Sequence, residues 1–221
     1  MNLCYVPGMS RSSSLCGVIL AAGASSRMGR DKALLPWPPP AAGGQVPGQT
    51  FLSAAIQAFS VYSEMVIVVA GSNEASLAPV IYAHGASLVR NPDPDRGQFS
   101  SLQTGLQEVL NRGRDVALVT LVDRPPARAT TVGALRDAFQ AAERDVWAVV
   151  PEYQGKHGHP YIAGRELMEA FLRAPATGTA REIEHQHQAH IRYMPVEDPF
   201  ITLNVDTPED YAALQRRPAA D

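Results

Sequence analysis

The chain is poor in cysteine, with only Cys4 and Cys16 in 221 residues. Two cysteines cannot form the multi-bridge framework of a small secreted domain or supply the ligand set of a zinc ribbon. We expect Cys16, at the start of an apolar strand, to be a small buried hydrophobic side chain. This cysteine content is typical of proteins in a reducing cytoplasm.

Long hydrophobic runs and an excess of one charge are also missing. No apolar run approaches the roughly 18 residues that a membrane span needs. Residues 1–15, rich in Ser, Gly and Pro, lack the apolar core of a secretory signal, and we predict a disordered tail there. The formal net charge of -3 gives no basic surface for nucleic acid. We therefore expect neither a membrane nor a nucleic acid as a partner.

The chain does have the composition of a globular domain, with 45% hydrophobic and 19% charged residues. Short apolar runs alternate with amphipathic stretches of helical period. The predicted strands are residues 17–21, 65–70, 86–89, 116–121, 147–150 and 191–195. The predicted helices are residues 51–61, 100–111, 130–142, 165–172, 179–187 and 208–216. This alternation predicts one α/β domain over residues 16–217, with a doubly wound, mostly parallel sheet.

Residues 36–48 break this regularity because they are rich in proline and glycine, which excludes a helix or a central strand. We interpret the segment as a flap beside the loop that precedes it. An insertion unrelated to function is the alternative, and the sequence does not decide between the two.

The most informative stretch is residues 17–32, where an apolar strand leads into a loop of small residues. Small side chains let the backbone approach a base or a phosphate closely, and the N–H groups of such a loop form an anion-binding concavity. Arg27 then offers a fork of donors and Lys32 a point charge. The pattern favours binding of a nucleoside triphosphate.

This loop matches neither of the two common phosphate loops. Gly29 is not followed by the Lys-Ser/Thr pair of a Walker A loop. A dinucleotide fingerprint needs three glycines, but only Gly23 and Gly29 occur here. A plain Gly/Ala turn with solvated charges therefore stays open as an alternative.

Residues 20–36 read Leu-Ala-Ala-Gly-x-Ser-x-Arg-Met-Gly-x-x-Lys-x-Leu-Leu-Pro, which resembles the signature loop of the MobA-like nucleotidyltransferases. Further matching blocks follow in the family's order at residues 97–106, 121–125, 158–160 and 204–210. Within the family, the sequence is most similar to the molybdenum cofactor cytidylyltransferases. From the first block to the last, these matches span nearly the whole chain after the first fifteen residues.

The resemblance implies a Rossmann-like enzyme that transfers CMP from CTP to the phosphate of molybdopterin, releases pyrophosphate and uses Mg²⁺. It implies that Arg27, Lys32 and Asp123 are catalytic. It also makes Ala22 a specificity residue, because Ala-Ala-Gly is the cytidylyl form of the loop and Ala-Gly-Gly the guanylyl form. The nucleotide-binding residues that it implies are Leu20, Ala21, Ala22, Gly23, Arg27, Lys32, Gly97, Ser100 and Ser101. Read without the family, Ser100 is a plausible helix N-cap.

Two carboxylates are the candidate metal ligands. Asp123 follows the predicted strand 116–121, at the end where open α/β sheets bind ligands, and it matches the family's metal-binding aspartate. Asp206 is the predicted second ligand, with Asn204 as the alternative. Read in isolation, Asp206 or Thr207 is favoured as the N-cap of the last helix. A pair of carboxylates with phosphate oxygens suits Mg²⁺.

Two residues of the segment 155–160, His159 and Lys156, are the candidate acceptor-binding residues. A turn-stabilising histidine and a solvated lysine are the alternatives. We expect no metal site at the histidines near residues 185–190, because their spacing does not put all three on one helix face.

Arg124 departs from the family, which usually has an apolar residue between this aspartate and the proline. It would contact the triphosphate, or neutralise Asp123 and weaken metal binding. Two other functions therefore stay open. One is the same chemistry with GTP, or with a sugar phosphate or another metabolite as acceptor. The other is a non-catalytic molybdopterin carrier or chaperone, with a molybdenum hydroxylase apoenzyme as its partner.

Overall fold

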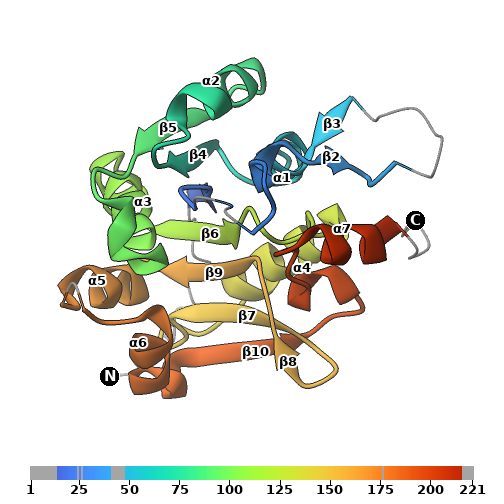
Figure 1. Cartoon of the computed structure of the whole chain (residues 1–221). Coiled ribbons are helices and arrows are strands. Elements are labelled where there is room, and N and C mark those ends of the chain that lie inside the picture. The colour runs from blue at the N-terminus through green and yellow to red at the C-terminus, as the bar shows by residue number, and fades with distance from the viewer. Residues whose placement is uncertain (1–13, 24, 26, 41–47, 176, 216–221) are drawn as a thin grey trace, which may run out of the picture.

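The computed structural model describes residues 14–23, 25, 27–40, 48–175 and 177–215 (Figure 1). The predicted tail at residues 1–15 lies outside these ranges except for its last two residues, and so do residues 41–47 of the predicted flap. On either side of residues 41–47, β2 (Pro36–Trp37) and β3 (Gln49–Thr50) pair as antiparallel strands. The flanks of the predicted flap are thus tied to each other.

A mixed sheet forms the centre of the molecule. Its order is β10-β7-β9-β6-β1-β4-β5, with β8 beside β7, and Figure 1 shows it from β5 at the top to β10 at the bottom. The strands are β1 (Leu15–Leu20), β4 (Met65–Ala70), β5 (Ser87–Arg90), β6 (Val116–Leu121), β7 (Ala148–Tyr153), β8 (Lys156–His157), β9 (Tyr161–Gly164) and β10 (Ile191–Pro195). Central β1 pairs in parallel with β4 on one side and β6 on the other.

The predicted mostly parallel sheet is confirmed, but the strands β2, β3, β8 and β9 and the helix α2 (Glu74–Ala83) were not predicted. Strand β9 lies between β6 and β7 and runs antiparallel to both. It is short and includes alanine and glycine, so it lacks the β-branched run that marks the other strands. Helix α2 contains Pro79, which obscures its helical pattern.

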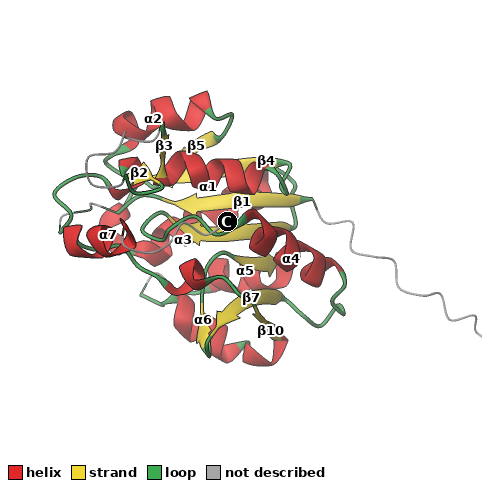
Figure 2. Cartoon of the chain, turned by 90° about the vertical axis from the view of Figure 1, so that its right-hand side faces the viewer, coloured by secondary structure: helices red, strands yellow, loops and turns green. Residues whose placement is uncertain are grey.

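Helices cover both faces of the sheet. They are α1 (Phe51–Ser60), α2, α3 (Gln98–Asn111), α4 (Ala129–Gln140), α5 (Arg165–Arg173), α6 (Ala180–Gln186) and α7 (Pro208–Gln215). Side chains of α1, α2 and α4 pack on one face, and those of α3, α5 and α6 pack on the other. Figure 2 shows these layers with β1 through the middle of the molecule. This is the doubly wound arrangement that the sequence predicts.

Alternate residues of β1 point into the two layers, as the twofold period of a strand requires. Ile19 belongs to the core beneath α1 and α4, whereas Cys16 and Val18 belong to the core beneath α3. The prediction for Cys16 is confirmed, since it is fully buried among hydrophobic side chains. Burial raises the pKa of its thiol to about 12, which keeps it protonated at neutral pH. Within the described ranges, no helix combines the length and apolar character that crossing a membrane requires.

The predicted N-cap at Ser100 is wrong. Helix α3 begins at Gln98, and its N-cap is Gly97 with φ 92°. This positive φ is readily adopted only by glycine, and it lets the chain enter the helix earlier than the serine suggests. Ser100 lies in the first turn, where its hydroxyl donates to the carbonyl of Gly97 at 2.8 Å.

The turn after β8 packs tightly against a 3-10 helix that follows β10, η4 (Pro199–Thr202). The N–H of His159 donates to the carbonyl of Ile201 at 2.9 Å. A β-carbon on Gly158 would overlap that same carbonyl group. Only glycine therefore allows the two segments to approach so closely.

Gly158→Ala is expected to lower the melting temperature, because the added methyl group must displace the backbone of Ile201. Such overpacking costs about 1–3 kcal/mol. Thermal unfolding followed by circular dichroism measures the change. Gly48→Ala is the control, because a β-carbon at this exposed position meets nothing within 4 Å. Equal melting temperatures for the two variants would contradict this packing.

Candidate active site

A cavity of about 360 Å³, here called the small cavity, opens where β1 and β6 end. Its walls include Leu20 at the end of β1, with Leu121 and Asp123 at and after the end of β6. From β1 the chain proceeds to β4 on one side and later returns to β6 on the other. The strand order reverses here, and open α/β sheets bind their ligands at such a reversal.

The small cavity brings together most of the residues that the sequence assigns to a nucleotide. Its walls include Leu20, Ala22, Gly23, Lys32, Gly97, Ser101 and Asp123. Ala21 and Ser100 are buried and do not line it. Arg27 is exposed and is not part of the wall either. Lys32 and Asp123, which the resemblance makes catalytic, therefore line the same cavity.

Asn73, which sequence reasoning missed, fixes the loop after β1. Its amide nitrogen donates to the carbonyl of Ala21 at 2.9 Å and to the carboxylate of Asp31 at 2.7 Å. Its amide oxygen accepts from the N–H of Gly71 at 3.0 Å. These contacts tie the loop to the end of β4. The available signal was an asparagine shortly after a predicted strand, at the same edge of the sheet.

Lys32 and Arg27 converge on one carboxylate. The Lys32 side chain is only 10% exposed, and its Nζ donates to Oδ1 of Asp206 at 2.5 Å. Arg27 Nη2 lies 3.4 Å from the same oxygen. A mostly buried ammonium group needs such a partner, because desolvation otherwise disfavours its charge. The two cations predicted to hold a triphosphate thus lie beside the same carboxylate, and of the two only Lys32 lines the small cavity.

Asp123 has a carboxylate oxygen, Oδ1, that is buried and accepts no hydrogen bond from any described residue. Burial raises the pKa of Asp123, while the nearby positive charges of Lys32 and Arg124 lower it. The repulsion of the Asp206 carboxylate adds to the increase. An oxygen with no donor, close to a second carboxylate, is the environment that a divalent cation would complete.

Thr207, and not Asp206, caps helix α7. The N–H of Asp210 donates to the Thr207 hydroxyl at 3.2 Å, and the Asp210 carboxylate accepts from the N–H groups of Asp206 and Thr207. This reciprocal arrangement leaves the Asp206 side chain available to Lys32 and Arg27. The alternative ligand, Asn204, is exposed.

Asn91, which directly follows β5, is a second residue that sequence reasoning missed, and it supports the part of the small cavity's wall that contains Ser101. Its buried amide donates to the hydroxyls of Ser100 and Ser101 at 2.8 and 2.9 Å. Ser101 faces the cavity, whereas Ser100 bonds to the main chain behind it. The structure therefore gives the two predicted serines different positions.

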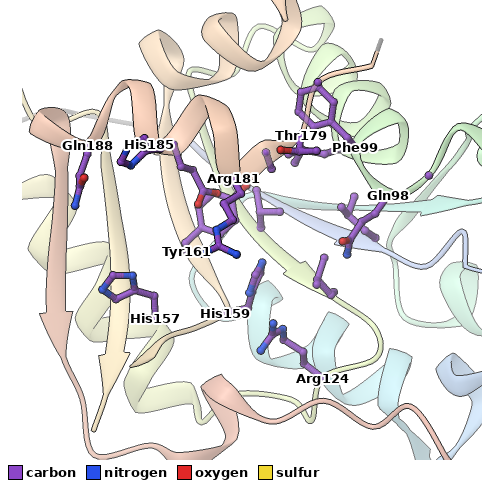
Figure 3. A pocket seen from close by; sticks show the side chains of 18 of the residues that line it. Gln98, Phe99, Arg124, His157, His159, Tyr161, Thr179, Arg181, His185 and Gln188 are labelled. Atoms are coloured by element: carbon purple, nitrogen blue, oxygen red, sulfur yellow. The ribbon is translucent and has the colours of Figure 1, made fainter. Parts of the chain in front are cut away.

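A second cavity of about 970 Å³, here called the large cavity, adjoins the small one (Figure 3). The residues that line both cavities are Leu20, Gly97, Gln98 and Leu121. The remaining wall of the large cavity comes mostly from residues 157–193. Figure 3 shows His159 and Tyr161 facing this space from β9 and the turn before it, with Arg181 of α6 above them.

Arg124 lines the large cavity and not the small one. Its Nη1 donates to the carbonyl of Ile201 at 3.1 Å, while its Nε is buried and has no partner among the described residues. Burial and the positive charge of Arg124 lower the pKa of the neighbouring His159 to about 3. His159 is therefore neutral at physiological pH, and its Nδ1 is also buried without a described partner.

The other sequence candidates lie elsewhere. Lys156 is exposed on β8 and lines neither cavity. His187 and His190 pack on the ring of Trp147, with centroid distances of 5.0 and 4.0 Å. Across the part of the chain that is described, no cluster of three or more His, Cys, Asp or Glu side chains is placed to hold a metal.

Comparisons with known proteins agree with this geometry. Residues 17–192 match the model of the MobA-like NTP transferase domain. The chain is 26% identical to the molybdenum cofactor cytidylyltransferase of Escherichia coli (strain K12), over 90% of this chain and 95% of that protein. It is 35% identical to a probable molybdenum cofactor guanylyltransferase of Rhodopirellula baltica, over 89% of each.

The fold is similar to the crystal structure of Rv0371c from Mycobacterium tuberculosis H37Rv, with a TM-score of 0.76 and 25% identity over 93% of this chain and 98% of that one. A complex of Rv0371c with manganese has also been solved. A doubly wound sheet with two adjoining cavities at its switch point, in a chain with these relatives, defines a nucleotidyltransferase. The chain belongs to the MobA-like NTP transferase family.

Asp123→Asn is expected to raise the melting temperature near pH 8 when no divalent metal is present. Because burial raises the pKa of Asp123 in the folded state, ionisation of this group destabilises the fold above the pKa of the unfolded chain. The difference in melting temperature between Asp123→Asn and the wild type should shrink as the pH falls to about 4, where the wild-type carboxyl group is protonated. Thermal unfolding across this pH range measures the difference.

Asp95→Asn is the matched control, because Asp95 lines the same cavity and is exposed. It should change the free energy of unfolding by no more than about 0.5 kcal/mol, and the melting temperature correspondingly little. A destabilised Asp123→Asn variant near pH 8 would show that an unidentified donor satisfies the buried oxygen.

Proposed function

We propose that this protein transfers CMP from CTP to the terminal phosphate of molybdopterin and releases pyrophosphate. The observation that carries this proposal is the shared wall of the two cavities, formed by Leu20, Gly97, Gln98 and Leu121. A nucleotide in the small cavity would meet an acceptor in the large cavity along this wall. The name of one relative, a molybdenum cofactor cytidylyltransferase, supports this pair of substrates, whereas the name of another, a probable molybdenum cofactor guanylyltransferase, supports the same acceptor with GTP.

In the proposed reaction, an oxygen of the acceptor phosphate attacks the α-phosphorus of CTP. The bond from that phosphorus to the bridging oxygen breaks, and pyrophosphate leaves with its electron pair. The attacking phosphate is already anionic, so the step needs no general base, consistent with a neutral His159. The protein contributes mainly positioning and charge neutralisation. We expect Lys32 and Arg27 to bind the triphosphate and stabilise the charge of the departing pyrophosphate.

Asp123 and Asp206 are the residues that would hold a divalent cation. The unsatisfied Oδ1 of Asp123 supports this assignment, and Mg²⁺ typically takes one or two carboxylates together with phosphate oxygens. When bound, Mg²⁺ would neutralise phosphate charge and orient the triphosphate. Lys32 lies 2.5 Å from Asp206, and we expect it to exchange this carboxylate for phosphate when the substrate binds.

The alanine at position 22 supports CTP rather than GTP as the nucleotide substrate. Ala22 lines the small cavity, and the loop that carries it passes close to Gly71, directly after β4. A β-carbon on Gly71 would lie 2.8 Å from the carbonyl oxygen of Ala22 and 3.3 Å from its β-carbon. Glycine at position 71 therefore lets this loop pass close to the end of β4, and we expect the methyl group of Ala22, compared with glycine, to narrow the site in favour of the smaller pyrimidine.

Purified protein with CTP, Mg²⁺ and molybdopterin is expected to release pyrophosphate. Lys32→Ala and Asp123→Ala should each lower kcat/KM by at least about a hundredfold, since each removes charge stabilisation of the transferring phosphates. Arg192→Ala is the control, because Arg192 is exposed on β10 and lines neither cavity. CTP-dependent stabilisation in a thermal shift assay should accompany activity. Molybdopterin binding without pyrophosphate release from any nucleotide would indicate a carrier instead.

Ala22→Gly is expected to shift the ratio of kcat/KM values from CTP toward GTP by about tenfold or more, because one methyl group less widens the base end of the cavity. Parallel pyrophosphate assays with CTP and GTP measure this ratio. Ala141→Gly, at the exposed C-cap of α4, should leave the ratio unchanged. A wild-type preference for GTP would overturn the assignment of CTP while leaving the transfer reaction in place.

A further inference from the structure

The large cavity contains a carboxylate with no assigned role. Glu184 belongs to α6 and lines this cavity, where it is partly buried. Its carboxylate forms no hydrogen bond or ion pair with any residue that the structure describes. Burial raises its pKa. A carboxylate kept in such a place is costly unless a ligand supplies the missing donors.

The surroundings of Glu184 are aromatic. Its charge contributes to the raised pKa values of Tyr161 and Tyr193, so both phenols lie near it. The ring of Tyr193 stacks on His157, with centroids 3.7 Å apart and an angle of 6° between the planes. Tyr161, Tyr193 and His157 all line the large cavity. This end of the cavity therefore suits a flat ring system more than a sugar.

A positive charge lies at the other end of the cavity. Figure 3 shows Arg124 well separated from Arg181 and His185 of α6, with His159 between them. Arg124 follows Asp123, which lines the small cavity, so it lies at the junction of the two spaces. Its guanidinium is held by Ile201 and retains a buried Nε with no described partner. An acceptor phosphate at this junction would meet an available donor.

We propose that Glu184 recognises the ring of the acceptor by accepting two hydrogen bonds from adjacent N–H donors, while Arg124 receives the acceptor's phosphate. The 2-aminopyrimidinone edge of a pterin presents such a pair of donors, and a carboxylate pairs with two parallel N–H groups in the same way as it pairs with arginine. This inference rests on the proposed function and specifies how its acceptor is selected. Small phosphorylated acids present no such donor pair and leave most of a 970 Å³ cavity empty.

The test uses two fluorescent probes that differ at one position. One is 6-hydroxymethylpterin monophosphate, and the other is its lumazine analogue, in which a carbonyl oxygen replaces the 2-amino group. Fluorescence titration of the wild-type protein should give at least about tenfold tighter binding of the pterin, since a charged hydrogen bond is lost with the analogue. Glu184→Gln should weaken pterin binding about tenfold and abolish the discrimination.

Glu143→Gln is the matched control, because it makes the same change at an exposed position outside both cavities. It should retain the discrimination between probes. Glu184→Gln should also keep the CTP-dependent thermal shift of the wild type, which separates lost recognition from lost folding. In pyrophosphate assays with molybdopterin, its KM for the acceptor should rise about tenfold with little change in kcat.

Equal wild-type affinities for the two probes, or discrimination that survives in Glu184→Gln, would overturn the inference. Both results leave the proposed transfer reaction intact if pyrophosphate is still released with molybdopterin. Glu184-dependent discrimination without pyrophosphate release from any nucleotide would instead support the acceptor assignment and contradict the proposed reaction. The two failures are therefore distinguishable.

Discussion

One main-chain hydrogen bond joins two distant parts of the chain at the site. The N–H of Val205 donates to the carbonyl of Asp123 at 2.8 Å, which ties the segment before α7 to the loop after β6. Asp206 follows Val205 directly, so the same bond brings its carboxylate to Lys32 from the first loop. The whole arrangement of charges depends on this closure, because its members are distant in sequence.

The closure creates a site in which charges of both signs are held close together. Lys32 is mostly buried against Asp206, while Asp123 keeps an unsatisfied oxygen in the same cavity. Neither arrangement is optimal for stability, since desolvation opposes each charge. Binding sites for highly charged ligands are expected to carry this kind of strain, because the ligand supplies the missing partners.

The sequence alone was sufficient to predict the parallel part of the sheet, because β1, β4 and β6 are buried on both faces and appear in the sequence as continuous apolar runs. It was also sufficient to predict that the residues of the loop after β1 and Asp123 lie at one edge of the sheet, because both follow the end of a strand. Strand β9 could not be predicted, because an antiparallel insertion of four residues has no periodic signal. The role of Asn73 depends on contacts with β1 and the loop, which only the tertiary structure creates.

The antiparallel insertion of β9 has a consequence for how this molecule can diversify. It divides the sheet into a parallel half that builds the small cavity and a second half, with α5 and α6, that supplies most of the remaining wall of the large one. Each half has its own strand pairing, and the two halves pair with each other along the β6–β9 ladder. Substitutions in residues 157–193 can therefore change the lining of the large cavity while the residues that line the small cavity stay the same. Most of the lining of each cavity thus comes from a different part of the chain.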